Sequence, residues 1–501
     1  MPAEPPLSTA VSRNRRPLVV GAIMLATFMV AMEATIVATA MPRIVGELGG
    51  FTYYAWVFSA YLLAQSATTV IYGKLADVFG RKPVLIFGIT LFIAGSLLCG
   101  FAWSMLSLVV FRLVQGIGAG AIQPVTITVI GDLFSFEERG RAQGMNASVW
   151  ATSAVTGPLA GALIVEHMSW AWIFWINVPF GVLAIAGFVT FLKETIEPRE
   201  VSIDYAGAGL FTIAIVSLLV ALTETEASAT TLALLAAIFV VGGTAFLLQE
   251  RRAKEPIISI ALWGRRLVAT INGATLLSGM APIGLTTVLP IYVQSVMGRS
   301  AMVAGFTLTM LIFGWPLAVM LSSRFFRAFG LRRTLRAGGV FLPLGAALLL
   351  LLDPQGHPAI AGVASFLMGF GMGLISLTSF VLVQDSVEWS MRASATASVI
   401  FSRSLGNTLG ATALGAVLNL GIAHYGSGEL AAGVHALLNR PDGLARLAAD
   451  AAVRPVFDQA LHLTFWAIIA VALLTCVLIW MVPVAFRPAS AAAAKQPAPA
   501  D

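Results

Sequence analysis

The chain has 501 residues, of which 58% are apolar and only 11% are charged. An ordinary globular domain carries about 25% charged residues, so a soluble protein of this length could not cover its surface with so few charges. The composition excludes most soluble enzymes, secreted disulfide scaffolds and disordered proteins. It favours a chain whose solvent is the lipid bilayer.

The net charge of +6 is distributed in short basic clusters that separate long apolar runs, as Arg251-Arg252 and Arg265-Arg266 illustrate. Clusters of this kind set the topology of a membrane protein, whereas a nucleic-acid-binding protein gathers its charge on one face. We therefore expect no nucleic-acid partner. Cys99 and Cys476 lie far apart inside apolar runs, and no disulfide is expected between them.

The first apolar run, residues 18–40, follows three arginines in the manner of a secretory signal. A hydrocarbon core of about 30 Å requires about 20 helical residues, however, and this run is long enough to span it. We interpret it as a transmembrane helix and not as a cleaved signal, because further apolar runs follow it along the chain. These further runs are 52–72, 84–101, 104–131, 142–165, 171–192, 205–223, 229–248, 267–290, 301–321, 334–352, 358–383, 393–422 and 461–482.

Together the runs predict an all-α integral membrane protein with fourteen transmembrane helices. They are continuous and lack the alternating pattern of β-barrel strands. When the N-terminus is placed inside and the loops alternate, the inner segments contain 23 of the 30 Lys and Arg residues, if Arg336 at the inner end of run 334–352 is counted with them, and the outer segments contain five. This asymmetry predicts that both termini are cytoplasmic and that the number of spans is even, with twelve spans as the alternative.

Three local sequence matches recur along the chain at nearly one offset, which indicates an internal duplication. They relate Phe79-Gly80-Arg81-Lys82 to Phe329-Gly330 and Arg332-Arg333 (offset 250), Gly116-x-Gly118-x-Gly120 to Gly369-x-Gly371-x-Gly373 (253), and Ala147-Ser148-Val149 to Ala397-Ser398-Val399 (250). The offset makes spans 9–14 a repeat of spans 1–6 and leaves spans 7 and 8 as an inserted pair. Parallel repeats of six spans are typical of transporters.

The predicted domains are therefore two six-helix bundles in parallel repeat plus two inserted helices. The bounds are an N-terminal cytoplasmic tail at 1–17, the first bundle at 18–200, the inserted pair at 201–256, the second bundle at 257–486 with an outer loop at 423–460, and a disordered cytoplasmic tail at 487–501.

Glu33 is the one acidic residue clearly deep within a predicted span, where a charge costs about 2.5–3.5 kcal/mol on insertion scales. Arg112 in span 4 lies at the same depth, roughly 12 Å below the outer surface at 1.5 Å per residue. Burial favours the neutral carboxyl and a nearby guanidinium favours the carboxylate, so the pair is a candidate proton-coupling site. The alternatives are a static salt bridge between spans 1 and 4, or a carboxyl that is kept neutral by hydrogen bonds or faces an aqueous vestibule.

The inner end of span 2 carries a charged segment that runs from Gly73 to Lys82. Asp77 and Arg81 are four residues apart and share one face of a helix, so they can pair. Gly73 allows another helix to approach closely, and Gly80 permits a tight turn. We interpret the segment as a conformational latch. A positive-inside loop would explain its basic residues but not Asp77 with the glycines.

Span 5 contains Gly157-Pro158-Leu159-Ala160-Gly161, which predicts a kink or a close helix–helix contact. Other polar residues lie within or beside spans, and we expect some to line a cavity and the others to bond neighbouring helices. They are Thr35, Gln65, Gln115, Gln123, Asn177, Asn272, Gln294 and Arg403.

These segments resemble the sequence signatures of the major facilitator superfamily over nearly the whole chain. Residues 73–84 resemble its signature between spans 2 and 3, 112–120 its span 4 motif, and 157–161 its span 5 antiporter motif. Within the family, residues 33–42, 172–179 and 395–410 are similar to the fourteen-span drug:proton antiporters, a multidrug efflux branch.

The resemblance implies that Glu33 is the proton-coupling acid, that Arg112 tunes it, and that Gly157 and Pro158 mark export rather than uptake. It also implies that Gly73, Asp77 and Arg81 belong to the inner latch. This chain departs from the family pattern in two respects. The span 1 motif usually carries aspartate where Glu33 stands, and span 10 has no carboxylate, which argues against a preference for divalent cations.

The sequence as a whole predicts a proton-driven exporter of hydrophobic or amphipathic small molecules in a bacterial inner membrane. Its expected partners are the lipid bilayer, protons and a small-molecule substrate, and no accessory export partner is identified. The proton gradient replaces any cofactor. The alternatives are an exporter of one endogenous metabolite and, more remotely, an uptake symporter or a membrane protein without transport activity. We expect no enzyme, because HExxH motifs and paired aspartates are absent from the spans, and no metal site, because all five histidines lie outside spans or at their ends.

Overall fold

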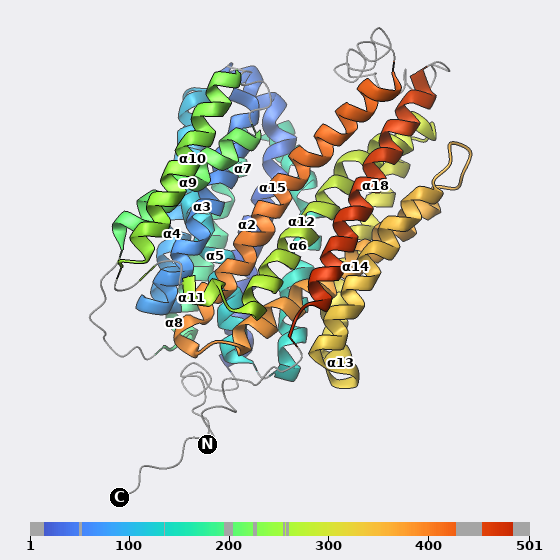
Figure 1. Cartoon of the computed structure of the whole chain (residues 1–501). Helices are drawn as coiled ribbons and strands as arrows, with labels where there is room; N and C mark the ends of the chain where they lie inside the picture. Colours follow the sequence, from blue (N-terminus) through green and yellow to red (C-terminus); the bar gives the residue numbers. More distant parts are fainter. Residues whose placement is uncertain are drawn as a thin grey trace, which may run out of the picture. The chain divides into compact units, whose positions relative to one another are not determined.

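The computed structural model describes residues 15–49, 53–134, 136–194, 204–223, 228–253, 256, 260–426 and 453–483. Over these ranges the regular elements are all helical (Figure 1). Most of the predicted outer loop 423–460 and the whole tail 487–501 lie outside the described residues.

The first part of the chain forms seven helices at the six predicted apolar runs. They are α2 (Arg16–Leu48), α3 (Tyr54–Phe79), α4 (Arg81–Gly100), α5 (Met105–Leu133), α6 (Phe136–His167), α7 (Trp172–Trp175) and α8 (Asn177–Phe191). The first two helices end eight and seven residues beyond their runs, and the run 171–192 is divided between two helices. The start of α5 agrees with its run for a local reason. The Ser104 hydroxyl accepts from the Ser107 amide and the Ser107 hydroxyl accepts from the Ser104 amide, so this capping box fixes where the helix begins.

The rest of the chain continues in the same way. Its elements are α9 (Tyr205–Thr223), α10 (Ala229–Glu250), α11 (Ile260–Trp263), α12 (Arg266–Ile291), the π-helix η3 (Tyr292–Val296), α13 (Ala301–Leu348), η4 (Leu349–Leu351), α14 (Ala359–Asp385), η5 (Trp389–Met391), α15 (Arg392–Tyr425) and α18 (Val453–Trp480). Within α13, Gly330 has φ 77° and ψ 163°, which is not helical, so α13 is two helices joined at a break. The two predicted runs 301–321 and 334–352 fall on either side of it.

Ten helices in the described part of the chain are long and apolar enough to cross a membrane, with α13 counted once. This establishes a multi-pass helical membrane architecture. The count of fourteen spans stays a prediction, because length and composition alone do not assign α3, α6 and α9 to the bilayer.

The chain divides into two compact units. Unit 1 comprises residues 1–268, 380–401 and 483–501, and unit 2 comprises residues 269–379 and 402–482. The predicted inserted pair, 201–256, belongs to unit 1, where α9 and α10 pack side by side and α9 also packs against α3 (Figure 1). The segment 380–401, which we placed in the second bundle, is also part of unit 1. The boundaries of the two compact units therefore differ from those of the two predicted six-helix bundles.

Glycines on α5 and α14 make matching contacts in the two units. On α5, a Cβ at Gly116 or Gly120 would meet α3, and one at Gly118 would meet α4. On α14, a Cβ at Gly369 or Gly373 would meet the first half of α13, and one at Gly371 would meet the second half. Each glycine triplet thus permits two helices to approach closely in alternation. The breaks that precede these contacts also correspond, since Gly80 (φ 91°) separates α3 from α4 as Gly330 separates the halves of α13.

Two apolar clusters fill the interior of unit 1, and α2 contributes to both. One cluster includes Met29 of α2 with Phe92 and Phe188, and the other includes Met32 with Phe174. Glu33 follows Met32 directly and is fully buried. The candidate site is therefore a polar island enclosed by close-packed apolar side chains.

Candidate functional site

Glu33 on α2 receives two hydrogen bonds inside unit 1. Arg112 of α5 donates from Nη1 to Oε1, and Asn177 at the start of α8 donates from Nδ2 to Oε2 over 2.6 Å. The carboxylate and the amide are fully buried, and Arg112 is only 1% exposed. The structure therefore places in contact the two residues that the sequence pairs by their equal depth in spans 1 and 4.

Arg112 also binds groups other than the carboxylate. Its Nε donates to the carbonyl oxygen of Val57 over 3.0 Å, and its Nη1 donates to Gln115 Oε1 over 2.7 Å. The guanidinium carbon lies 4.3 Å from the centroid of the Tyr61 ring, a cation–π distance. The arginine is consequently held by α3 and α5 as well as by Glu33.

Gln115 and Ser96 complete the network. Gln115 Nε2 donates to Ser96 Oγ over 2.7 Å, and Asn177 Nδ2 approaches the same oxygen at 3.1 Å. The sequence predicts that Gln115 and Asn177 either line a cavity or bond neighbouring helices. Both are fully buried, and they join α5, α4 and α8 around Glu33.

Sequence reasoning missed Ser96, Tyr61 and the carbonyl of Val57. A serine, a tyrosine and a backbone oxygen are ordinary components of membrane helices, so nothing in their spacing marks them. One usable signal was Gly95, because a Cβ there would lie 2.6 Å from Cα of Gln115. The glycine brings α4 against α5 and so places Ser96 beside Gln115.

The arrangement allows Glu33 to change its charge without leaving its neighbours unbonded. A buried guanidinium whose sole partner was lost would be strongly destabilised. Arg112 keeps the Val57 carbonyl, Gln115 Oε1 and the Tyr61 ring when Glu33 is neutral, and Asn177 can donate to a neutral carboxyl as well as to a carboxylate. The network can therefore accommodate a proton on Glu33.

The inner cluster is the second polar assembly, formed by the Gly73–Lys82 segment with residues 385–394. Asp77 Oδ1 accepts from the amide of Ala393 over 2.9 Å, and Oδ2 accepts from the amide of Ser394 over 2.7 Å. These amides belong to the first turn of α15, where a negative charge is favourable. A Cβ at Gly73 would overlap Ala397, so the glycine permits this close approach of α3 and α15.

Arg81 is completely buried in the inner cluster. It lies 3.3 Å from Asp77 and 3.3 Å from Asp132, the latter at the end of α5. Its Nη2 donates to the carbonyl of Trp389 over 2.9 Å, and its guanidinium stacks on the Trp389 ring at 3.9 Å. Arg392 in turn pairs with Asp132 over 3.1 Å. Asp132, Trp389 and Arg392 were not identified from the sequence, because they are distant in the chain from the signature segment.

Gly80 and Lys82 position the start of α4. Gly80 has a φ of 91°, which allows the turn between α3 and α4. Glu194, just after α8, accepts from the amides of Arg81 and Lys82, each over 2.9 Å. Burial raises the pKa of Glu194, and these two amides oppose that rise. Lys82 Nζ donates to the carbonyl of Val189 over 2.8 Å, so it anchors α4 to α8.

The predicted antiporter motif of span 5 lies on α6 and packs against α2 beside Glu33. A Cβ at Gly157 would collide with the Thr35 side chain, and one at Gly161 would lie 3.1 Å from the carbonyl oxygen of Ile36. Thr35, which we had expected as a cavity residue, donates to the carbonyl of Ser153 over 3.2 Å. The glycines therefore bring α6 onto the helix that carries the carboxylate. Pro158 lies within α6 between them.

The remaining predicted cavity residues do not join these assemblies. Gln65, Gln123, Gln294 and Arg403 are half-buried, and Asn272 is buried. Gln294 donates to the carbonyl of Pro290 in its own helix over 3.2 Å, and Arg403 donates to Ser376 Oγ over 3.3 Å. No group of three or more potential metal ligands occurs among the residues that the structure describes.

Comparison with known proteins gives one consistent result. Residues 23–411 match the family model described as Major Facilitator Superfamily. The chain is 39% identical over 415 residues to "Multidrug resistance protein 3" of Bacillus subtilis (strain 168), covering 82% of this chain and 81% of that protein. It is 32% identical over 417 residues to "Multidrug transporter protein MdtP" of the same organism, covering 82% and 77%. Among solved structures it resembles the human organic anion transporter MFSD10 in fold, with a TM-score of 0.63, 14% identity, and coverage of 92% of this chain and 99% of that one.

Proposed function

Because the chain belongs to the major facilitator superfamily, and is thus a multi-pass membrane transporter and not an enzyme, we propose that it exports hydrophobic or amphipathic small molecules in exchange for protons. The names of its Bacillus relatives support drug efflux. The observation that carries proton coupling is the buried carboxylate of Glu33, held by Arg112 and Asn177 within the membrane-spanning part of unit 1.

In this proposal Glu33 binds a proton from the outer side and releases it to the inner side as access to the site alternates. The carboxyl is neutral in one half of the cycle and ionised in the other. Arg112 favours the ionised form, and the surrounding apolar clusters favour the neutral form. A change in hydration of the site is therefore sufficient to load or release the proton.

The architecture that belongs to this function is two six-helix repeats with an inserted pair, fourteen spans in all, and both termini in the cytoplasm of a bacterial inner membrane. The matching glycine contacts of α5 and α14 support the repeat. The 23 basic residues in the expected inner segments, with Arg336 at the inner end of its span included, support the orientation. The inner cluster around Asp77 acts as the conformational latch, because the hydrogen bonds from the α15 amides to Asp77 hold α3 and α15 together in the arrangement described here.

The deciding experiment measures substrate efflux and proton movement in proteoliposomes with an imposed proton gradient. Glu33→Gln keeps the shape of the side chain and removes its titration, so we expect gradient-driven efflux to fall to background while substrate binding persists. The matched control is Glu47→Gln on the same helix, where Glu47 bonds Arg43 and Trp170 near the end of α2. Unchanged coupled efflux in Glu33→Gln contradicts the assignment of the proton site.

Two further outcomes of the same assay separate the alternatives. Accumulation of substrate in the direction of proton flow would show a symporter and contradict export. A panel of dyes and antibiotics distinguishes a multidrug exporter, for which we expect several structurally unrelated substrates, from an exporter of one endogenous metabolite.

A further inference from the structure

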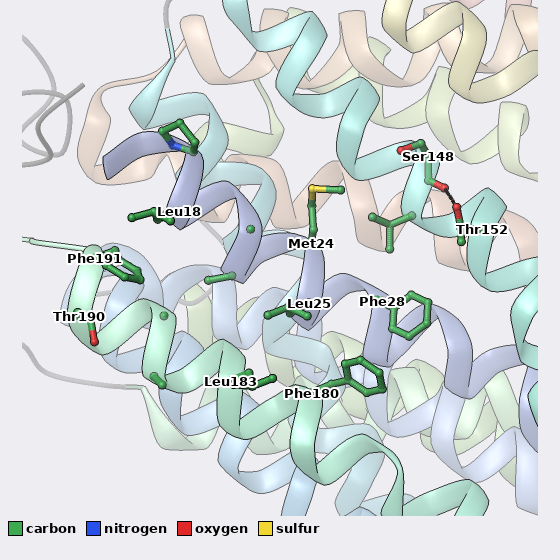
Figure 2. A pocket seen from close by; sticks show the side chains of 16 residues that line it. Leu18, Met24, Leu25, Phe28, Ser148, Thr152, Phe180, Leu183, Thr190 and Phe191 are labelled. Carbon is green, nitrogen blue, oxygen red and sulfur yellow. Dashed lines mark hydrogen bonds between the residues drawn. The ribbon is translucent and has the colours of Figure 1, made fainter. Parts of the chain in front are cut away.

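A groove with a volume of about 910 Å³ lies between α2, α6 and α8 of unit 1 (Figure 2). Its walls are apolar side chains such as Leu18 and Leu25 of α2 and Leu183 of α8. Leu18 and Leu183 are 48% and 58% exposed, so the groove is open along its side. Nothing in the network around Glu33 or in the inner cluster uses it.

Three side-chain hydroxyl groups line the groove; those of Ser148 and Thr152 donate hydrogen bonds within their own helix, and that of Thr190 is exposed. Ser148 donates to the carbonyl of Met145 over 2.7 Å, and Thr152 donates to the carbonyl of Ser148 over 3.0 Å (Figure 2). The protons of Ser148 and Thr152 are therefore not directed at a ligand. An occupant that requires hydrogen bonds finds little here, whereas a hydrocarbon chain finds a continuous apolar surface.

The length of the groove corresponds to one leaflet of a bilayer. Along α2 its lining residues run from Pro17 to Phe28, and eleven residues of helix rise roughly 16 Å. The hydrocarbon core of a bilayer is about 30 Å thick, so one leaflet contributes about 15 Å. At the end of the groove that Phe28 lines, Phe28 and Phe180 meet edge to face with ring centroids 5.2 Å apart.

The two ends of the groove differ in charge. Arg15 precedes the first lining residue by two positions, and Lys193 follows the last, Phe191, by two positions. Both basic residues are exposed. The apolar groove therefore begins beside two cations and ends at two aromatic rings, which is the polarity of an anionic amphiphile with its head at Arg15 and its tail toward Phe28.

We propose that this groove binds an anionic phospholipid of the cytoplasmic leaflet, with one acyl chain along α2 and the phosphate near Arg15 and Lys193. Length and charge both favour a leaflet lipid over a short drug-like molecule. The end of the groove at Phe28 and Phe180 lies near the coupling site, because Phe28 is five residues before Glu33 and Phe180 is three residues after Asn177. The lipid would therefore support the packing of the two helices that hold the carboxylate.

The test titrates the purified full-length protein in detergent with phosphatidylglycerol or phosphatidylcholine of equal chain length and counts bound lipids by native mass spectrometry. The native protein should bind one phosphatidylglycerol more tightly than phosphatidylcholine. Gly21→Phe fills the groove from α2, where a Cβ would meet nothing within 4 Å, and Ala186→Phe, at an exposed lining residue, fills it from α8. Each variant should weaken binding of both lipids by about tenfold, since the ring displaces buried methylene groups.

Two controls make the result specific. Gly46→Phe places the same ring at an equally open position of α2 outside the groove and should leave lipid binding unchanged. The double variant Arg15→Gln, Lys193→Gln should bind phosphatidylglycerol about tenfold more weakly and phosphatidylcholine as before, so that the preference is lost. The double variant Arg251→Gln, Arg252→Gln, which also changes two exposed basic residues, should keep the preference. Native-like phosphatidylglycerol binding by a folded Gly21→Phe or Ala186→Phe protein would overturn the proposal. So would displacement of the lipid by a transported dye alone.

Discussion

Arg112 has more acceptors than an ion pair with Glu33 requires. Beside the carboxylate it binds the Val57 carbonyl and Gln115, and it stacks on Tyr61. Any buried guanidinium needs partners for the N–H groups that its carboxylate does not bind, so a static salt bridge would also use these contacts. The proposed titrating role requires in addition that the contacts persist when Glu33 is neutral, and the Val57 carbonyl, Gln115 and Tyr61 meet that requirement.

The first prediction at the residue scale concerns unequal costs of removing the two partners. Arg112→Met leaves a buried carboxylate with Asn177 as its remaining donor, and we expect a loss of about 3 kcal/mol of stability. Glu33→Gln should cost less, because Arg112 retains other acceptors. The double variant should be more stable than Arg112→Met alone. Unfolding midpoints in detergent measure the stability of the native protein, the two single variants and the double variant. If the two single substitutions cost the same stability and their costs add in the double variant, the coupled network is contradicted.

At the scale of single elements, the close packing of α4 on α5 is what places Ser96 beside Gln115. Gly95 sits at that contact, and its replacement requires the backbones to separate. The contact matters for the site because Ser96 receives hydrogen bonds from both Gln115 and Asn177. A substitution at Gly95, which has no polar side chain, is thus expected to disturb the hydrogen bonds around the Glu33 carboxylate.

The second prediction follows from this contact. Gly95→Ala places a Cβ 2.6 Å from Cα of Gln115, so we expect a lower unfolding temperature and reduced coupled efflux. The control is Gly209→Ala on α9, where a Cβ meets nothing within 4 Å. There the substitution should stabilise the protein by roughly 0.5–1 kcal/mol. Identical behaviour of the two variants would contradict a role for the close approach.

The third prediction concerns how the stability of the protein depends on pH through Glu194, which binds the first amides of α4. Burial raises the pKa of Glu194 above its ordinary value, so the folded protein holds this proton more tightly than the unfolded chain. Its contribution to stability is therefore greatest at low pH and declines as the pH rises through the folded pKa. Thermal unfolding measured from pH 4 upward should show that decline in the native protein and a weaker one in Glu194→Gln. If stability instead rises with pH in the native protein more than in Glu194→Gln, the raised pKa of Glu194 is contradicted.

At the scale of the whole molecule, the inner cluster joins segments that are more than 300 residues apart in the chain. Asp77 bonds the amides of Ala393 and Ser394, and Arg81 bonds the carbonyl of Trp389. Contacts between distant segments are those that a global rearrangement can break as a set. This is why we place the latch here rather than in the Glu33 network.

The fourth prediction tests the latch by chemical accessibility. Asp77→Asn weakens two charge-assisted hydrogen bonds, which we expect to shift the contact by about 2 kcal/mol. Ala397 is buried against Gly73, and in a background lacking Cys99 and Cys476 the introduced thiol of Ala397→Cys should then react faster with a maleimide. Asp204→Asn, a change of the same kind at a carboxylate that bonds Gly207 and Gln249, should leave the labelling rate unchanged. Equal labelling rates with and without the Asp77→Asn substitution would argue against the latch.

The fifth prediction tests the topology. Reporter fusions that end in the tails should be cytoplasmic, and a fusion between spans 7 and 8, near residue 225, should be on the outer side. The two-sided pattern follows from fourteen spans. If the fusion near residue 225 is cytoplasmic, the inserted pair does not cross the membrane as we expect, and the twelve-span alternative stands.

Several features were predictable because they depend on residues that are close in the chain or on bulk composition. The apolar runs fall on helices, since a helix in lipid must satisfy its own backbone and needs a full apolar length. Glu33 and Arg112 could be paired because equal depth in two spans leaves few partners for a charge. The close approach at Gly73 was predictable because glycine has a local steric meaning.

Other features required the tertiary structure. Ser96, Tyr61 and Val57 reach Arg112 or Gln115 only because α3 and α4 pack against α5 at glycine contacts, and their residue types carry no signal by themselves. Asp132 and Arg392 meet through a contact between segments 260 residues apart. The groove between α2, α6 and α8 could not be predicted from the sequence, because the sequence does not distinguish leucines on a packed helix face from leucines on an open one. Composition and periodicity determine that the chain spans a membrane and where its charges are costly, since those follow from local solvation. Which groups satisfy these charges is decided by packing, because it depends on distances between helices that the chain order does not contain.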